Sequence, residues 1–184
     1  MARNVYNFVL GVCVLGAVAW FLAAGRKERA GAAVPAADFL PTEIAYLRPE
    51  TGDVILRARG HERPYLAMRI PPMTGYSIQA ALEGTRLPRP SSHDLFVQAL
   101  GCAGVRVLGA DIVDERDRVF IAVLRLKCGS RTVNLDSRPS DAIAIALRAG
   151  APVRIHRRVL DMDGLAVETE RLPNGVLHGT SREM

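Results

Sequence analysis

The sequence predicts an α+β domain, a mostly antiparallel meander sheet with packed helices, preceded by one N-terminal transmembrane helix. Three observations lead to this fold class. Short alternating or apolar segments are bounded by turn residues and interrupted by amphipathic helical segments. A run of 20 uncharged residues stands near the N-terminus. The apolar fraction of 49% and the charged fraction of 23% are ordinary for a globular protein. Collagen, low-complexity disorder and a disulfide-stapled mini-protein are excluded.

The uncharged run, Val5 to Ala24, predicts a single-pass membrane anchor at residues 1–25. A helix of this length spans a hydrocarbon core of about 30 Å, and Trp20 near its end suits the membrane interface. The alternative is export with a cleaved signal, for which alanines at 32–37 offer a late cleavage site. The basic residues on the two sides of the run favour, by one charge, a cytoplasmic C-terminal domain.

Residues 26–41 are rich in Ala, Gly and Pro and predict a flexible tether, followed by a domain at 42–160. The first strands are expected at 52–60 and 65–72, because turn residues bound both segments. A helix is expected at 75–85, where apolar residues recur at helical spacing before Gly84.

A second helix is predicted to begin near Ser91, whose spacing to Asp94 resembles a capping box. Its expected apolar face consists of Leu95, Phe96, Ala99, Leu100 and Ala103. Strands are expected at 105–115, 118–129 and 130–138, with a turn at Arg116-Asp117 and a tight hairpin at Gly129-Ser130.

The last helix is predicted at 139–150, because Pro139 stands near its first position and Gly150 at its end. Its alanine-rich face allows close packing on a sheet. A short strand at 151–155 completes the domain, and the tail at 161–184 is expected to be poorly ordered.

Two polar clusters remain as candidate functional sites, RPSSHD at 89–94 and DSRPSD at 136–141. Both place Arg-Pro-Ser and then Asp at a helix start, where free backbone N–H groups favour anions. One interpretation is that their serines and aspartates only cap helices. The sequence shows no phosphate-binding loop, no zinc-type cysteine pair and no nucleophile elbow. The spacing of Cys102 and Cys128 does not decide whether they pair.

The functional interpretation gathers both clusters around one groove. His93, Asp94, Asp136 and Asp141 are the candidate catalytic residues, with Asp136 and Asp141 as ligands of Mg²⁺ or Mn²⁺. Candidate phosphate-binding residues are Arg89, Arg138 and Ser140. This chemistry suits phosphodiester hydrolysis. The domain itself is only mildly basic, because much of the net charge of +5 flanks the apolar run, so charge alone does not indicate a nucleic-acid surface.

The runs RPSSHDLF (89–96), VFIAVLRL (119–126) and LDSRPSDAIAIALRAGAPVRI (135–155) resemble the bifunctional nuclease domain family, known in bacteria as a domain of unknown function. The resemblance covers about residues 53–155 and is most specific at Asp136 to Ala144. The segment Ile70 to Ser77 departs from the family, which has a Trp-Ile-Gly type turn and then an acidic helix start.

The resemblance implies an α+β domain that forms homo-oligomers, with DNase and RNase activity attributed chiefly to plant members. It carries over to His93, Asp94, Asp136, Arg138, Ser140 and Asp141. Two functions follow as expectations. The first is a membrane-anchored, metal-assisted nuclease acting on RNA or DNA. The second is a non-catalytic ligand-binding or protein-assembly module of the same fold.

Overall fold

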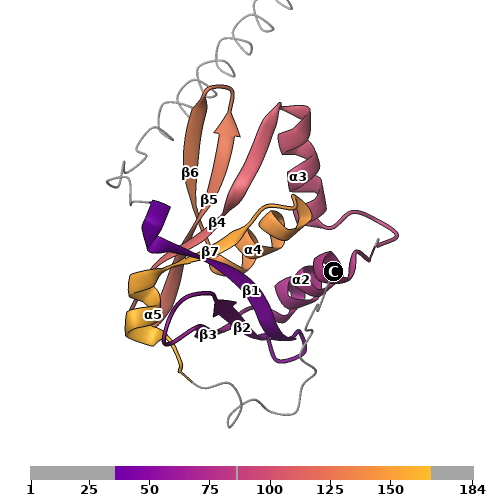
Figure 1. Cartoon of the computed structure of the whole chain (residues 1–184). Helices are drawn as coiled ribbons and strands as arrows, with labels where there is room; N and C mark the ends of the chain where they lie inside the picture. The colour runs from indigo at the N-terminus through magenta and orange to yellow at the C-terminus, as the bar shows by residue number, and fades with distance from the viewer. Residues whose placement is uncertain (1–35, 86, 167–184) are drawn as a thin grey trace, which may run out of the picture. The chain divides into compact units, whose positions relative to one another are not determined.

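A computed structural model describes residues 36–85 and 87–166 of the chain (Figure 1). After a 3-10 turn at Ala36–Asp38, the elements in order are β1 (Phe39–Arg48), β2 (Asp53–Ala58), β3 (Tyr65–Arg69), α2 (Pro72–Glu83), α3 (Ser92–Cys102), β4 (Val105–Arg116), β5 (Val119–Cys128), β6 (Arg131–Ser137), α4 (Pro139–Arg148), β7 (Val153–His156) and α5 (Arg157–Asp163).

The seven strands form one sheet in the order β3-β2-β1-β7-β4-β5-β6. Neighbouring strands are antiparallel except β4 and β7, which are parallel. The predicted α+β class with a mostly antiparallel sheet is therefore confirmed. The parallel pair follows from the short strand β7, which enters the middle of the sheet after α4 instead of extending the meander at its edge.

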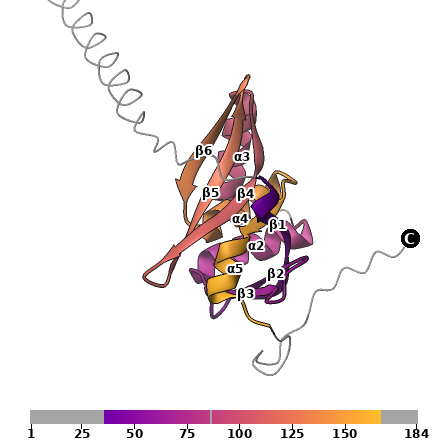
Figure 2. The same ribbon diagram turned by 60° about the vertical axis from the view of Figure 1, so that its left-hand side comes forward.

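Helix α4 is the centre of the packing. It contacts β4, β5 and β7 and lies between α2 and α3 (Figures 1 and 2). Its buried residues are Ser140, Ala142, Ile143, Ala144, Ile145 and Ala146. The small alanines let the helix backbone lie close to the sheet, and the isoleucines fill the space beside it. Since α2 and α3 both lie against this buried helix, α4 decides which of their side chains meet.

The hairpin turn predicted at Gly129-Ser130 is confirmed, whereas the turn predicted at Arg116-Asp117 lies one residue further along the chain, at Asp117-Arg118. Between β4 and β5, Asp117 and Arg118 both have positive φ, 53° and 64°, as a two-residue turn of this hand requires. Between β5 and β6, Gly129 has φ 59°. Each turn fixes the register of the strands it joins, so that Val123 of β5 stands opposite Asp136 of β6.

Two predicted boundaries are corrected by the structure. The tether predicted at 26–41 is too long, because β1 begins at Phe39 and pairs with β2 and β7. The domain also continues past residue 160: α5 buries Val159 and Leu160 in the core, and Leu165 bridges to Tyr65. Sequence periodicity missed β1, because this strand has a bulge between Ile44 and Tyr46 that interrupts its alternation.

The apolar face predicted for the second helix is only loosely packed. In the described structure α3 has no fully buried residue, and Leu95 is 62% exposed. The helix lies beside α4 and β4. Its residues Val97 and Leu100 are partly buried and pack against a small apolar cluster of β5 and α4.

The membrane anchor predicted at residues 1–25 lies outside the described residues. Among the helices of residues 36–85 and 87–166, none combines the length and apolarity needed to cross a bilayer.

Candidate active site

The capping box predicted at the start of α3 is confirmed. The Ser91 hydroxyl accepts a hydrogen bond from the Asp94 backbone N–H at 3.2 Å, and the Asp94 carboxylate accepts from the Ser91 backbone N–H at 2.8 Å. The Ser91 hydroxyl also donates to this carboxylate. The box satisfies N–H groups that the first helical turn leaves without partners. It fixes the direction in which α3 begins, and with it the position of His93.

Arg148, at the end of α4, holds three helices together at this point. Its guanidinium donates from Nε to Asp94 Oδ1 at 2.7 Å, from Nη2 to the Ser77 carbonyl oxygen at 2.9 Å and from Nη1 to the Ala144 carbonyl oxygen at 3.0 Å. The side chain of Arg148 is only 8% exposed. A buried guanidinium needs such a set of acceptors, so Arg148 fixes Ser77 of α2 relative to α3 and α4. No sequence pattern indicates this role, since arginine is abundant throughout the chain.

The charge state of Asp94 follows from these bonds. The hydrogen bonds from Ser91, above all from its hydroxyl, and the bond from Arg148 lower the pKa of the Asp94 carboxyl below its ordinary value, against the opposing effect of burial. Asp94 is thus an ionised structural group. Its oxygens serve the helix cap and Arg148, although the sequence predicted a catalytic role for it.

The second helix start, at α4, is built differently. Its N-cap is Arg138, whose side chain makes no capping hydrogen bond in the described structure, and Pro139 occupies the first turn. The Asp141 carboxylate instead contacts two side chains. Its Oδ2 accepts from Arg138 Nε at 2.7 Å, and its Oδ1 lies 3.4 Å from His93 Nε2. Asp141 therefore joins α4 to α3 through an imidazole.

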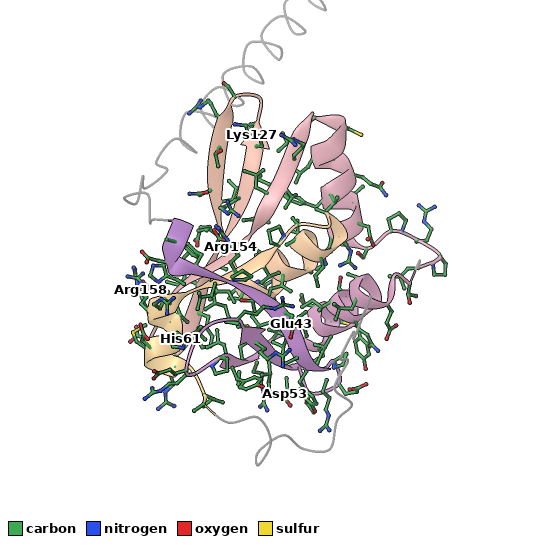
Figure 3. The ribbon with its side chains drawn as sticks, viewed as in Figure 1. Glu43, Asp53, His61, Lys127, Arg154 and Arg158 are labelled. Carbon is green, nitrogen blue, oxygen red and sulfur yellow. The ribbon has the colours of Figure 1, made fainter. Side chains whose placement is uncertain are left out.

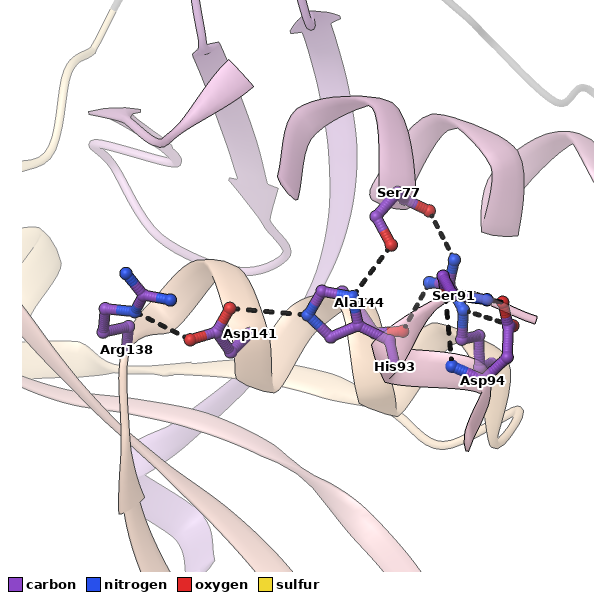
Figure 4. Close-up of polar contacts among 8 residues, drawn as sticks. Ser77, Ser91, His93, Asp94, Arg138, Asp141 and Ala144 are labelled. Atoms are coloured by element: carbon purple, nitrogen blue, oxygen red, sulfur yellow. Dashed lines mark hydrogen bonds and ion pairs between the residues drawn. The ribbon is translucent and has the colours of Figure 1, made fainter. Parts of the chain in front are cut away.

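A row of polar side chains from three helices results (Figure 4). From one end it consists of Arg138, the N-cap residue of α4, then Asp141 of α4, His93 of α3 and Ser77 of α2. Ser77 Oγ lies 2.9 Å from His93 Nδ1. The imidazole is largely buried, with 15% exposure, and the Asp141 side chain is 26% exposed. Arg138 is 69% exposed, and it contacts Asp141 through its Nε (Figure 4).

The structure separates Asp136 from this row. Val123 of β5 stands between Asp136 of β6 and Asp111 of β4, so these three residues share one face of the sheet. The next residue, Ala122, points to the opposite face and is buried in the core with α4. Since successive residues of a strand point to opposite faces, Asp136 lies on the face of the sheet away from the helices. The predicted groove with Asp136 and Asp141 side by side is not formed.

The face that carries Asp136 has an ionic cluster of its own. Asp111 is buried, and it accepts hydrogen bonds from Arg154 at 2.8 and 2.7 Å and forms an ion pair with Arg125 at 2.8 Å. Arg154 in turn lies over the Phe39 ring (Figure 3 labels Arg154). These charges are paired with one another, so this cluster joins β4, β5 and β7.

Two of the predicted phosphate-binding residues also lie apart from the row. Arg89 stands in the exposed loop between α2 and α3, and no hydrogen bond or ion pair within the described part of the chain joins it to the row. Ser140 is buried on α4. Arg138 alone of the three predicted residues combines solvent exposure with contact to the row.

The donor set of this row does not fit the expected Mg²⁺ or Mn²⁺. Within residues 36–85 and 87–166, no group of three or more His, Cys, Asp or Glu side chains is arranged to hold a metal ion. The row offers one carboxylate, and the Arg138 guanidinium occupies one of its oxygens. Hard divalent cations prefer several oxygen ligands, and the described residues of the row do not supply such a set.

The histidines that the sequence left without a role have partners in the structure. His61 Nε2 lies 3.0 Å from Asp161 Oδ1, although 100 residues separate them. His156 caps α5 by accepting the Arg158 backbone N–H at 3.2 Å. Both contacts hold α5 in place. Ser77 is the site residue that sequence reasoning missed, because its contact to His93 depends on how α2 and α3 cross.

Comparison with known proteins gives a family-level match. The family model for the bifunctional nuclease domain matches residues 54–168. An uncharacterized protein of Mycobacterium tuberculosis is 31% identical over 123 residues, which cover 67% of this chain and 73% of that protein. Bifunctional nuclease 1 of Oryza sativa subsp. japonica is 29% identical over 133 residues, covering 71% of this chain and 38% of that protein. Bifunctional nuclease 1 of Arabidopsis thaliana is 26% identical over 133 residues, which cover 71% of this chain and 38% of that protein.

Proposed function

The chain belongs to the bifunctional nuclease domain family, and from this membership we propose that it hydrolyses phosphodiester bonds of RNA or DNA at the His93–Asp141 pair. The observation that supports the proposal is the contact of 3.4 Å between His93 Nε2 and Asp141 Oδ1, with Arg138 bound to the other carboxylate oxygen. An imidazole oriented by a carboxylate is the usual general base and acid of hydrolytic sites.

Each group of the row has a role in this proposal. His93 takes the proton of the attacking oxygen and returns it to the leaving oxygen. Asp141 orients the imidazole and stabilises the imidazolium that forms. The terminal nitrogens of Arg138 bind a phosphate oxygen of the polymer, because a guanidinium offers paired donors to oxyanions. No step passes through a metal ion, since the donor set does not fit one.

The test is cleavage of a fluorescently labelled single-stranded RNA or DNA by the full-length protein in detergent. Asp141→Asn should lower the cleavage rate by about 10²- to 10⁴-fold, the usual contribution of a general base system. The matched control is Asp161→Asn, which breaks the other His–Asp pair at a distance from the row. Equal rates for the Asp141→Asn variant and the wild type would contradict the proposal.

The metal expectation is tested in the same assay. EDTA should leave the rate unchanged if the row acts as described, and a requirement for added Mg²⁺ or Mn²⁺ would restore the metal-assisted mechanism expected from the sequence. In that case the cation would need oxygens from the substrate phosphates to complete its coordination.

A second candidate function is a non-catalytic binding module. The observation in its favour is that Asp94 and Asp141 are both paired with arginines of the same domain, as in a structural network. This function expects saturable binding of the labelled oligonucleotide without cleavage, with or without metal, and weaker binding for Arg138→Ala.

The location of the domain is also part of our proposal. We place it on the cytoplasmic side of a membrane, held by residues 1–25, because of the uncharged run and the basic residues that follow it. Protease treatment of inverted and right-side-out vesicles tests this: digestion of the domain only in inverted vesicles supports the orientation.

A further inference from the structure

The contact between Ser77 and His93 gives the row a third chemical group. Ser77 Oγ lies 2.9 Å from His93 Nδ1, and His93 Nε2 lies 3.4 Å from Asp141 Oδ1. The hydroxyl, the imidazole and the carboxylate thus stand in line, each supplied by a different helix (Figure 4). A hydroxyl bound to a base that is itself oriented by a third group is the signature of an activated nucleophile.

The direction of the hydrogen bonds follows from the partners. A neutral imidazole has one N–H donor and one acceptor nitrogen, and an ionised carboxylate only accepts. The contact with Asp141 therefore places the hydrogen on Nε2. Nδ1 is then the acceptor, and the Ser77 hydroxyl donates to it. Because both ring nitrogens are engaged, the proton that His93 can take directly is that of Ser77.

Another His–Asp pair of the same domain shows what is specific to this row. His61 and Asp161 are closer, at 3.0 Å, but Nδ1 of His61 accepts the backbone N–H of Arg63 at 3.1 Å (Figure 3 labels His61). That imidazole has no hydroxyl to activate and serves the packing of α5. In the row, Nδ1 of His93 instead faces the Ser77 hydroxyl, whose proton it can accept.

The surroundings hold Ser77 in this position. Arg148 Nη2 binds the Ser77 carbonyl oxygen at 2.9 Å, and Arg148 Nε binds Asp94, the neighbour of His93 in sequence. One buried guanidinium therefore fixes both the residue with the hydroxyl and the helix turn with the base. Such preorganisation is needed when reacting groups must stay within hydrogen-bond distance.

We propose that Ser77 is the nucleophile of the hydrolytic reaction, an inference that rests on the proposed function and goes beyond it. Ser77 Oγ attacks phosphorus and forms an O–P bond while its proton passes to His93 Nδ1. The bond from phosphorus to the leaving oxygen breaks, and His93 returns the proton to that oxygen. A water molecule then attacks the phosphoserine diester, loses a proton to His93, and displaces Ser77 Oγ, which regains the proton.

Arg138 has a defined place in this scheme. It stands at the opposite end of the row from Ser77, with Asp141 and His93 between them (Figure 4). It therefore binds a neighbouring phosphate of a nucleic-acid strand and not the phosphate under attack. The substrate class that fits is a polymer with more than one phosphate.

The experiment uses diisopropyl fluorophosphate, a phosphorus electrophile that traps activated serines with loss of fluoride. The full-length protein in detergent is treated with it, and peptides are mapped by mass spectrometry. We expect an adduct on Ser77, its formation slowed about 100-fold or more in His93→Ala and abolished in Ser77→Ala. Ser92→Ala, at an exposed position of the neighbouring helix start, is the control and should be labelled like the wild type.

The outcomes separate this inference from the proposed function. Three outcomes would overturn the role of Ser77 as nucleophile: oligonucleotide cleavage that persists in Ser77→Ala, no adduct on Ser77, or an adduct that forms equally fast in His93→Ala. A His93-dependent adduct on Ser77 in a protein that cleaves no oligonucleotide supports the nucleophile and overturns the proposed substrate. Should Ser77→Ala fail to fold, by circular dichroism, the labelling of wild type against His93→Ala decides the question.

Discussion

The starts of α3 and α4 carry nearly the same residues and use them in opposite ways. Both have Arg-Pro-Ser followed by Asp. At α3 the aspartate closes a capping box and binds a buried arginine, whereas at α4 it leaves the cap open and contacts an imidazole of another helix. The Asp94 carboxylate therefore serves its own helix cap and a buried arginine, whereas the Asp141 carboxylate contacts the side chains of Arg138 and His93.

The arginine partners should show the largest contrast between the two helix starts. Arg148→Met should lower the free energy of unfolding by about 3 kcal/mol, because the partly buried Asp94 carboxylate and the Ser77 carbonyl lose their buried partner. Arg138→Met should change it by less than about 1 kcal/mol, since that ion pair is exposed. Urea unfolding followed by circular dichroism measures both. Equal losses would contradict the contrast.

Substitution of the two aspartates should also cost more unfolding free energy at α3 than at α4, with a smaller difference than for the arginines. Asp94→Ala should cost about 2 kcal/mol of unfolding free energy, because it removes the capping box and unpairs Arg148. Asp141→Ala should cost about 0.5 kcal/mol, the scale of a partly exposed charge near a helix start. The same denaturation curves decide this, and a larger loss for Asp141 would assign it a structural role.

The pH dependence of stability should reflect Asp94. Its pKa in the folded protein is lowered, first by the Ser91 hydroxyl, while in the unfolded chain it is near 3.9. The unfolded state therefore binds more protons between the two pKa values. The stabilisation by Asp94 is fully present above about pH 4 and is lost as pH falls through the lower, folded value. The free energy of unfolding, measured from pH 2 to 5, should change less with pH in Asp94→Asn than in the wild type. The same pH dependence in both proteins would argue against a lowered pKa of Asp94 in the folded state.

Asp136 should have the smallest effect. It precedes α4 by three positions but lies on the other face of the sheet, so Asp136→Asn should leave the rate of oligonucleotide cleavage within about twofold and the stability within about 0.5 kcal/mol. A loss of cleavage as large as that of Asp141→Asn would restore the paired-carboxylate groove expected from the sequence.

The sequence predicted much of the fold because its signals are local. Pro139 and Gly150 mark the ends of α4, Ser91 and Asp94 the start of α3, and the turn residues the two hairpins. The strand β1 was missed, since a bulge interrupts its alternation. For the site, His93, Asp141 and Arg138 were predicted from their residue types at helix starts. Ser77 and Arg148 could not be, because their roles depend on contacts across 16 and 54 positions of the chain.

By itself, the sequence determined the class of the domain, the beginnings and ends of most elements, and a set of polar residues at two helix starts. Those are properties of neighbouring residues, set by periodicity, capping and turn geometry. Only the tertiary structure decided which of these residues meet. The face on which Asp136 lies depends on strand register, and the row from Arg138 to Ser77 depends on the packing of α2 and α3 against α4. Contacts between distant segments are set by packing in three dimensions, which no local pattern encodes.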